Sequence, residues 1–183
     1  MYSRSSEPVR FERDCAAVLV PQGDEVTLPA GTVGYITQSL GGSWTVFVEG
    51  NLMRIAGKDA DAIGKEPPQP IELPEGASDD DVEKLVWQQL RTCFDPEIPV
   101  NIVELGLVYS ADVRHRDDGR REVEVRMTLT APACGMGEIL VDDVRSKIEL
   151  IPTVAEADVE LVFDPPWNRT MMSELARLET GML

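Results

Sequence analysis

TLTAPACGMG, at residues 128–137, joins an alternating strand pattern to an amphipathic helix pattern that starts around Met136. The segment from Ala131 to Gly137 holds one proline, two glycines and two alanines, so the connection is small and tight. Cys134 is therefore expected near the first helical turn, where exposed amides and the helix dipole favour a thiolate. Such a thiolate can bind a soft metal, attack an electrophile or exchange disulfides. The alternative is a small buried thiol that fills space.

Outward from this stretch, the C-terminal part of the chain alternates helix and strand patterns. A capping-box-like start at Ser78–Asp81 precedes a helical face formed by Val82, Leu85, Val86, Leu90 and Cys93. That pattern makes Cys93 a core residue. Further along, the patterns predict a hairpin with strands at 107–116 and 122–130, a strand at 158–163 and a helix at 173–178. Between the second and third strands lies a second helix, with one face formed by Ile139, Leu140, Val144, Ile148 and Ile151. The order predicts an α+β fold, with a helix-strand-strand-helix-strand-helix layer on a small mixed sheet.

The N-terminal part reads as short strands broken by turns. Strand patterns cover residues 15–20, 25–28, 33–39 and 44–48, and Gly50-Asn51 fits a two-residue hairpin turn. Many short strands in so small a segment predict an all-β, SH3-like barrel, with Cys15 packed in its core. Residues 58–64 are predicted to form a short turn or a last helical turn.

A proline-rich stretch divides the chain into two domains. Residues 67–78 contain Pro67, Pro68, Pro70 and Pro74, which favour a semi-rigid linker over a helix or an inner strand. The expected domains are therefore 1–66 and 79–183. Residues 1–66 carry 6 basic and 9 acidic side chains, and the remainder carries 11 and 24. The acidity of the chain therefore belongs to the part after residue 66.

A net charge of −16 limits the partners that the chain can bind. Nucleic acids and anionic membrane surfaces attract basic surfaces, so neither is an expected partner. Three scattered cysteines do not make a disulfide framework, and the sequence shows neither a signal-peptide pattern nor an apolar run long enough to span a bilayer. The cytoplasm is the expected compartment. His115, the only histidine, lies in a polar turn and is expected to be solvated.

Three loops could carry the chemistry: residues 95–100, 131–137 and 164–167. If the last two strands run parallel through the crossover helix, the second and third loops share one sheet edge. Cys134 would then face the 164–167 turn, with Asp95, Glu97 and Asp164 as nearby hard ligands or proton acceptors. The alternative for these acids is ordinary turn chemistry, because aspartate before proline often starts a turn. Trp167 is more often a packing anchor than a binding platform.

These loops resemble the signatures of a known family. DPEIPVNIVELGLVY at 95–109, TLTAPAC at 128–134 and VELVFDPPW at 159–167 closely resemble the three motifs of the metal–sulfur cluster assembly factors. This family includes the bacterial SufT and PaaD-type factors and the eukaryotic cytosolic iron–sulfur targeting subunit. The resemblance covers about residues 79–183. LPAGT at 28–32 and LGGSWTV at 40–46 resemble the extra domain of long bacterial SufT proteins. Gly135 departs from the proline that many members place after the cysteine.

The resemblance implies an accessory factor in iron–sulfur cluster assembly. Cys134 would carry or deliver iron or a cluster, held transiently, to recipient apoproteins, and the pocket around it would be lined by Asp95, Glu97, Thr130, Asp164 and Trp167. The implied partners are the assembly machinery, the apoproteins and a second copy of the chain in a homodimer. No enzymatic activity is expected. Two alternatives stay open: a metal-free acidic adaptor that docks the machinery to clients, and a thiol-dependent enzyme.

Overall fold

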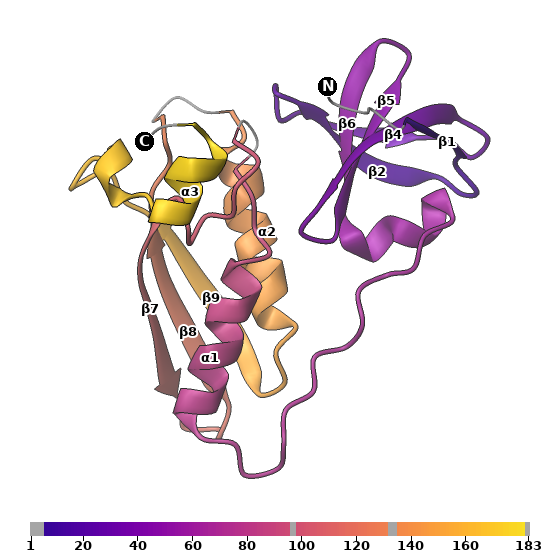
Figure 1. Cartoon of the computed structure of the whole chain (residues 1–183). Helices are drawn as coiled ribbons and strands as arrows, with labels where there is room; N and C mark the ends of the chain where they lie inside the picture. The colour runs from indigo at the N-terminus through magenta and orange to yellow at the C-terminus, as the bar shows by residue number, and fades with distance from the viewer. Residues whose placement is uncertain (1–5, 96–97, 132–134, 182–183) are drawn as a thin grey trace. The chain divides into compact units, whose positions relative to one another are not determined.

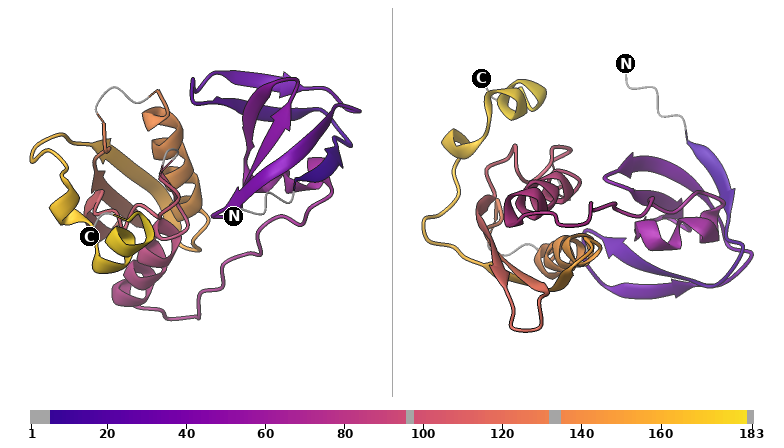
Figure 2. Two further views of the ribbon diagram at one scale, coloured as in Figure 1. Left: turned by 45° about the horizontal axis from the view of Figure 1, so that its top comes forward. Right: turned by 90° about the horizontal axis from the view of Figure 1, so that it is seen from below.

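The computed structural model describes residues 6–95, 98–131 and 135–181 (Figure 1). The chain divides into two compact units, one ending at Gln69 and the other beginning at Pro70. Figure 2 shows the elements of each unit from two further directions. The α+β class expected from the sequence is confirmed, since strands and helices are both present.

The N-terminal unit is a six-stranded antiparallel sheet with strand order β1-β4-β5-β6-β2-β3. Its strands are β1 (Glu7–Arg10), β2 (Cys15–Val20), β3 (Glu25–Leu28), β4 (Val33–Leu40), β5 (Ser43–Val48) and β6 (Asn51–Ile55), followed by a 3-10 helix, η1 (Gly57–Ile63). Phe11, Cys15, Val46 and Ile55 are at most 1% exposed and form the centre of its core. The core position predicted for Cys15 is confirmed, whereas the SH3-like barrel stays a prediction.

The β5–β6 hairpin differs by one residue from the sequence expectation. Val48 pairs with Asn51, so the turn consists of Glu49 and Gly50, both with positive φ, and not of Gly50 and Asn51. This register keeps Val48 and Met53 buried, and a shift by one residue would expose both. Burial therefore overrides the local preference of asparagine for the left-handed region.

The C-terminal unit places two long helices on one face of a three-stranded sheet. Its elements are α1 (Asp79–Leu90), β7 (Val108–His115), β8 (Arg121–Met127), α2 (Gly137–Glu149), β9 (Val154–Leu161), a 3-10 helix η2 (Arg169–Met171) and α3 (Glu174–Glu179). The central strand β8 pairs antiparallel with β7 and parallel with β9. Helices α1 and α2 lie side by side on the sheet (Figure 1). The predicted hairpin is confirmed, and the parallel pairing on which the shared sheet edge was conditional is present.

Alternation along β8 decides which face of the sheet the helices cover. Val123, Val125 and Met127 are fully buried and belong to the same core cluster as Val86 and Val144 of the two helices. The intervening residues of β8 are charged and project from the opposite face, because successive strand residues point to opposite sides. The apolar positions therefore specify one covered and one open face.

Helix α1 starts at a complete capping box. The Ser78 hydroxyl accepts a hydrogen bond from the Asp81 amide, and the Asp81 carboxylate accepts one from the Ser78 amide. Both bonds satisfy backbone donors that a helix start leaves free. The predicted start of this helix is thus confirmed, and so is the burial of Cys93 beyond its end.

Strand β9 begins earlier than the sequence indicates. The expectation was a strand at 158–163, but the observed strand spans Val154–Leu161. Its first residues pair with Arg121 and the start of β8, a partner more than thirty residues away that local patterning does not report. Within the described residues, no helix combines the length and the apolar character that crossing a bilayer requires.

Candidate functional site

The parallel pairing of β8 and β9 brings two of the three signature segments to one end of the sheet. Beyond the last paired residues, the Val162 amide donates to the Met127 carbonyl at 2.8 Å. On the other side, the Thr128 amide donates to the Leu107 carbonyl, also at 2.8 Å. The chain at Met127 and Thr128, where β8 ends, is therefore bonded on one side to the residue before β7 and on the other to the residue after β9.

The opening segment is organised by two side chains that accept backbone hydrogen bonds. Asp95 is 6% exposed, and its carboxylate accepts from the Ile98 amide at 3.0 Å. Asn101 accepts from the amides of Val103 and Glu104 through its side-chain oxygen. Asp95 thus performs the turn chemistry considered as the alternative for it, and it is buried beside the loop.

The closing segment is anchored on the opening one through side-chain donors. The Trp167 indole N–H donates to the Leu105 carbonyl at 2.7 Å, and the Tyr109 hydroxyl donates to the Pro165 carbonyl at 2.6 Å. Trp167 is half-buried against the C-terminal core, so it acts as an anchor here. Asp164, by contrast, is exposed.

A glycine lets the C-terminal segment pass close to the opening signature. Gly106 has φ +73°, and a β-carbon at this position would collide with the backbone of Met171. Next to this contact, the Ser173 amide donates to the Glu104 carbonyl at 2.8 Å. The segment that includes η2 and the start of α3 therefore packs directly against residues 104–106.

The start of α2 combines tight packing with an N-cap residue whose side chain forms no capping hydrogen bond. A β-carbon on Gly137 would lie 2.8 Å from the Leu129 side chain, so the first helical residue packs directly against the segment that follows β8. The N-cap residue, Met136, offers no side-chain hydrogen bond to the first-turn amides. Because a helix start carries partial positive charge and free N–H groups, this terminus favours an anionic neighbour.

The predicted site residues fall into three groups. Cys134 and Glu97 lie outside the described residues. Asp95 and Trp167 belong to the opening and closing segments, which the Leu105 and Pro165 hydrogen bonds join together. Thr130 is half-buried between the end of β8 and the start of α2, and Asp164 is exposed.

One polar residue of this region was missed by the sequence reasoning. Thr128 is fully buried, and its hydroxyl has no hydrogen-bond partner among the described residues. An orphaned buried hydroxyl is uncommon and costs stability, so it marks a place where a polar partner would be favoured. In the sequence this position could have been recognised as a threonine just after the end of β8, two residues after Arg126, which projects from the uncovered face of the sheet.

The other titratable candidates lie elsewhere. Cys15 and Cys93 are both buried, and burial raises the pKa of the Cys15 thiol. His115 is exposed, and its Nε2 lies 2.9 Å from a carboxylate oxygen of Asp79 beside the start of α1. No cluster of three or more histidine, cysteine, aspartate or glutamate residues suited to a metal ion occurs in the part of the chain that the structure describes.

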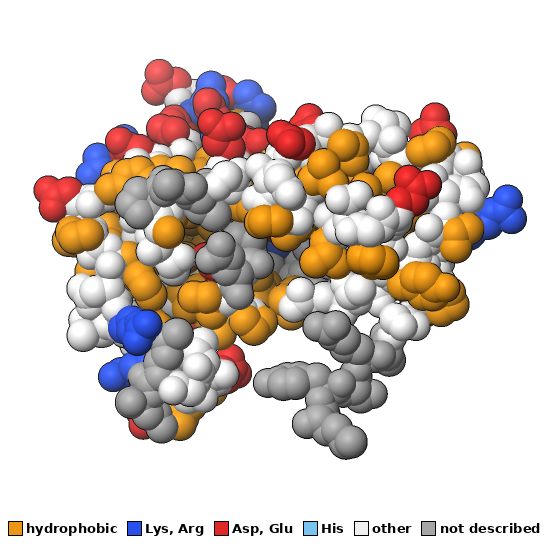
Figure 3. Space-filling view, turned by 90° about the horizontal axis from the view of Figure 1, so that it is seen from above, with side chains coloured by type: hydrophobic (Ala, Val, Ile, Leu, Met, Phe, Trp, Pro, Cys, Tyr) orange, Lys and Arg blue, Asp and Glu red, His pale blue; other side chains and the backbone are white. Residues whose placement is uncertain are grey.

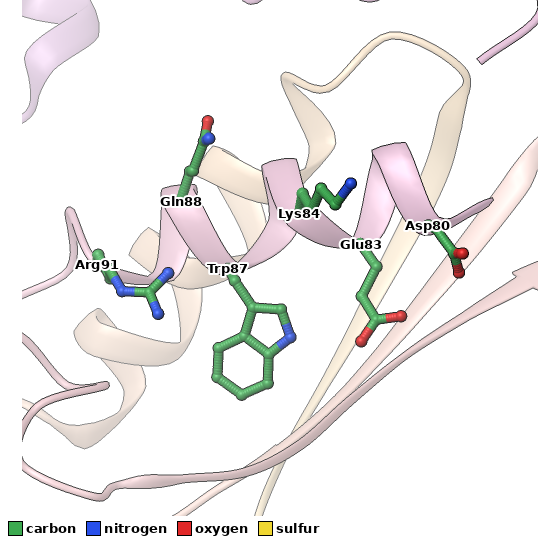
Figure 4. A pocket seen from close by; sticks show the side chains of 6 residues that line it. All are labelled: Asp80, Glu83, Lys84, Trp87, Gln88 and Arg91. Carbon is green, nitrogen blue, oxygen red and sulfur yellow. The ribbon is translucent and has the colours of Figure 1, made fainter. Parts of the chain in front are cut away.

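A hollow of about 530 Å³ runs along α1 and contains no predicted site residue (Figure 4). Figure 4 shows the Trp87 indole projecting from the helix, with charged side chains on both sides along its length. The lining residues are Asp80, Glu83, Lys84, Trp87, Gln88 and Arg91. The two acidic groups, Asp80 and Glu83, are balanced by two basic ones, Lys84 and Arg91, so the hollow has no net charge to select a ligand.

Comparisons with known proteins agree with the motifs. The family model described as "Iron-sulfur cluster assembly protein" matches residues 83–160. A relative named "Fe-S protein maturation auxiliary factor" from Porphyromonas gingivalis is 48% identical over 101 residues, which are 55% of this chain and 92% of the relative. A relative named "Fe-S protein maturation auxiliary factor SufT" from Staphylococcus aureus is 39% identical over 89 residues, 49% of this chain and 97% of the relative.

A solved structure is also similar. The crystal structure of a domain of unknown function from Bacillus anthracis is 33% identical, with a TM-score of 0.49, and the match covers 57% of this chain and 96% of that one. The family model lies wholly inside the C-terminal unit, where the three signature segments meet. With nearly the full length of the Porphyromonas relative matched at 48% identity, the chain belongs to the iron–sulfur cluster assembly protein family.

Proposed function

We propose that this protein is a non-enzymatic accessory factor of iron–sulfur protein maturation. In this proposal Cys134 holds iron or a cluster transiently and passes it to recipient apoproteins. The observation that carries the proposal is the start of α2, whose N-cap residue Met136 lies two residues after Cys134 and offers no side-chain cap, because a helix N-terminus lowers the pKa of a neighbouring thiol. The relatives named as maturation auxiliary factors support the same role.

A single thiolate leaves the cargo incompletely ligated, and this suits a donor. Iron–sulfur clusters are usually held by four ligands, so the remaining ones would come from a second copy, a carrier or the recipient protein. The proposal therefore includes a homodimer. It also places the protein in the cytoplasm, where reducing conditions keep Cys134 and the buried Cys15 and Cys93 as thiols. The N-terminal unit is proposed to be an SH3-like barrel.

The acids of the signature segments would have different roles. Asp95 is proposed to fix the opening loop, because its carboxylate already accepts the Ile98 amide. Asp164 and Glu97 are proposed to set the charge at the mouth of the site. Asp164 is exposed next to the anchored Pro165, which leaves its carboxylate accessible to solvent and cargo.

The test is anaerobic reconstitution of the full chain with iron and sulfide, followed by transfer to an apoprotein. We expect Cys134→Ala to lose bound iron and client activation. Cys93→Ala, which removes a buried thiol of the same unit, is the matched control and should retain both. Equal iron and equal activation in wild type and Cys134→Ala would remove the cysteine from the mechanism.

The adaptor is a second candidate because the open face of the C-terminal sheet is acidic. Asp112, Glu124 and Asp158 stand opposite one another on the three strands. Glu124 is paired with Arg114 at 2.9 Å, while Asp112 and Asp158 have no ion pair among the described residues. If the protein is an adaptor, the double variant Asp112→Asn, Asp158→Asn should lose client activation while Cys134→Ser retains it.

A further inference from the structure

The outer face of the N-terminal sheet carries a continuous line of apolar side chains, here called the apolar row. Strand pairing places its members opposite one another from β1 to β2, in the order Pro8, Tyr35, Phe47, Leu52 and Val20. Tyr35, Phe47 and Leu52 are 48%, 41% and 40% exposed. Hydrophobic side chains are visible on the surface of this unit in the right half of Figure 3. The core of the unit lies on the other face of the same strands.

The centre of the apolar row is hollowed and uncharged. Tyr35, Phe47 and Leu52 line a hollow of about 780 Å³ together with Ser6, Thr37, Gln38 and Thr45. None of these seven side chains is charged, although the chain as a whole has a net charge of −16. A charged group entering the hollow would lose hydration without gaining a counter-charge. The hollow therefore selects an uncharged occupant.

The exposed area is too small for a stable self-association. Aromatic side chains present roughly 150–250 Å² when fully exposed, so the exposed fractions of Tyr35, Phe47 and Leu52, together with that of Val33 beside the row, leave roughly 350 Å² of apolar surface. That is the size of a functional patch on a monomer, whereas a stable dimer buries about 800 Å² per partner. The area fits a transient contact with a short segment of another protein.

The shape of the row indicates the conformation of that segment. Four strand spacings of about 4.8 Å make the row about 19 Å long, the span of about six extended residues. Polar groups limit its width: Thr45 and Arg54 pair on one side, and Arg10 lies opposite Val33 on the other. A helix, about 10 Å wide, would cover these polar residues as well. An extended, strand-like segment is narrower and would cover the row without covering the polar residues beside it.

We propose that the apolar row of the N-terminal unit binds an extended, uncharged segment of a partner protein, about six residues long, with apolar side chains at alternate positions. This recognition goes beyond the cysteine chemistry and does not depend on it. It gives the N-terminal unit a task of its own: holding a partner while the C-terminal unit acts.

Direct binding to the full-length chain tests this proposal. The probe is a capped eight-residue peptide in which phenylalanine, leucine and valine alternate with serine and threonine. The control peptide replaces the three apolar residues by serine. We expect saturable chemical-shift changes confined to the five strands of the row, β1, β4, β5, β6 and β2, with the first peptide and none with the second. Shift changes elsewhere, or no saturable binding, would overturn the proposal.

A substitution in the apolar row tests the size of the effect on peptide affinity. Phe47→Thr keeps a strand-favouring residue at an exposed position, so the fold should survive. If binding buries the exposed part of Phe47, about 80 Å², its loss should weaken binding about thirtyfold. Leu150→Thr, at a 61% exposed leucine of the other unit, is the control and should bind as wild type. Equal affinities of the two variants would refute the assignment.

Sedimentation of the same variants decides between a foreign segment and a second copy. The proposal expects Phe47→Thr to leave the oligomeric state unchanged. If the wild-type chain is a dimer that Phe47→Thr dissociates, the row is a self-interface and the proposal is wrong. Cys134→Ala separates the two proposals, because it should abolish cargo transfer and leave peptide binding intact.

Discussion

Replacing Gly106 by alanine should detach the C-terminal segment from the opening signature. The new methyl group would collide with the backbone of Met171, and the residue would keep φ near +73°. Two costs follow. The left-handed conformation costs an alanine about 1–2 kcal/mol, and forcing atoms into a packed contact adds about 1–3 kcal/mol. We expect Gly106→Ala to lower the free energy of unfolding of this unit by about 2–5 kcal/mol.

Gly119→Ala is the matched control, because it carries the first cost without the second. Gly119 lies in the β7–β8 turn with φ +80°, and a β-carbon there would meet nothing within 4 Å. Gly119→Ala should therefore lower the free energy of unfolding by only about 1–2 kcal/mol. The difference between the two variants isolates the contact with Met171.

Urea unfolding in a Trp44→Phe background follows this unit alone, since Trp87 and Trp167 are then the remaining tryptophans. Hydrogen exchange of the Ser173 amide, which is bonded to the Glu104 carbonyl, reports detachment of the segment directly. Equal stability of the two glycine variants, with an equally protected Ser173 amide, would refute the reasoning.

Three further predictions concern single side chains. Trp167→Phe keeps most of the ring but leaves the Leu105 carbonyl without its donor, so the C-terminal unit should lose about 1–2 kcal/mol in urea unfolding. Hydrogen bonds from the Ser78 amide and, to a lesser extent, the Ser78 hydroxyl hold the pKa of Asp81 below its ordinary 3.8. The ionised carboxylate should therefore stabilise the folded unit above about that pH, and this contribution should be lost as the pH falls through the lowered pKa. An Asp81→Asn variant should lose this part of the acid dependence of the urea midpoint. Native alkylation followed by mass spectrometry should modify Cys134 ahead of the two buried thiols, and a slow rate equal for all three cysteines would contradict an accessible thiolate.

Local patterning predicted those elements whose signals lie within a few residues. The capping box at Ser78 and the alternation of Val123, Val125 and Met127 are complete in the sequence, and both elements are found where they were expected. The β5–β6 turn was misplaced by one residue because the burial of Val48, a tertiary property, sets the register.

The candidate site was predicted in outline and not in its contacts. The parallel pairing of β8 and β9 follows from the crossover helix, so the meeting of two signature segments could be anticipated. The anchors could not be, because Tyr109 and Trp167 bond to carbonyls 56 and 62 residues away. Every residue has a backbone carbonyl, so the amino-acid type does not indicate which carbonyl accepts the hydrogen bond.

Because β8 pairs with β7 antiparallel and with β9 parallel, the two ends of the C-terminal sheet carry different parts of the chain. All three signature segments gather where β8 and β9 finish, while the Asp117–Arg120 turn lies at the far end of the same strands. A fluorophore, an affinity handle or a surface linkage could be inserted at Gly119, where there is open space. The molecule can thus be immobilised or tracked by one end of its sheet while the other end stays available to clients.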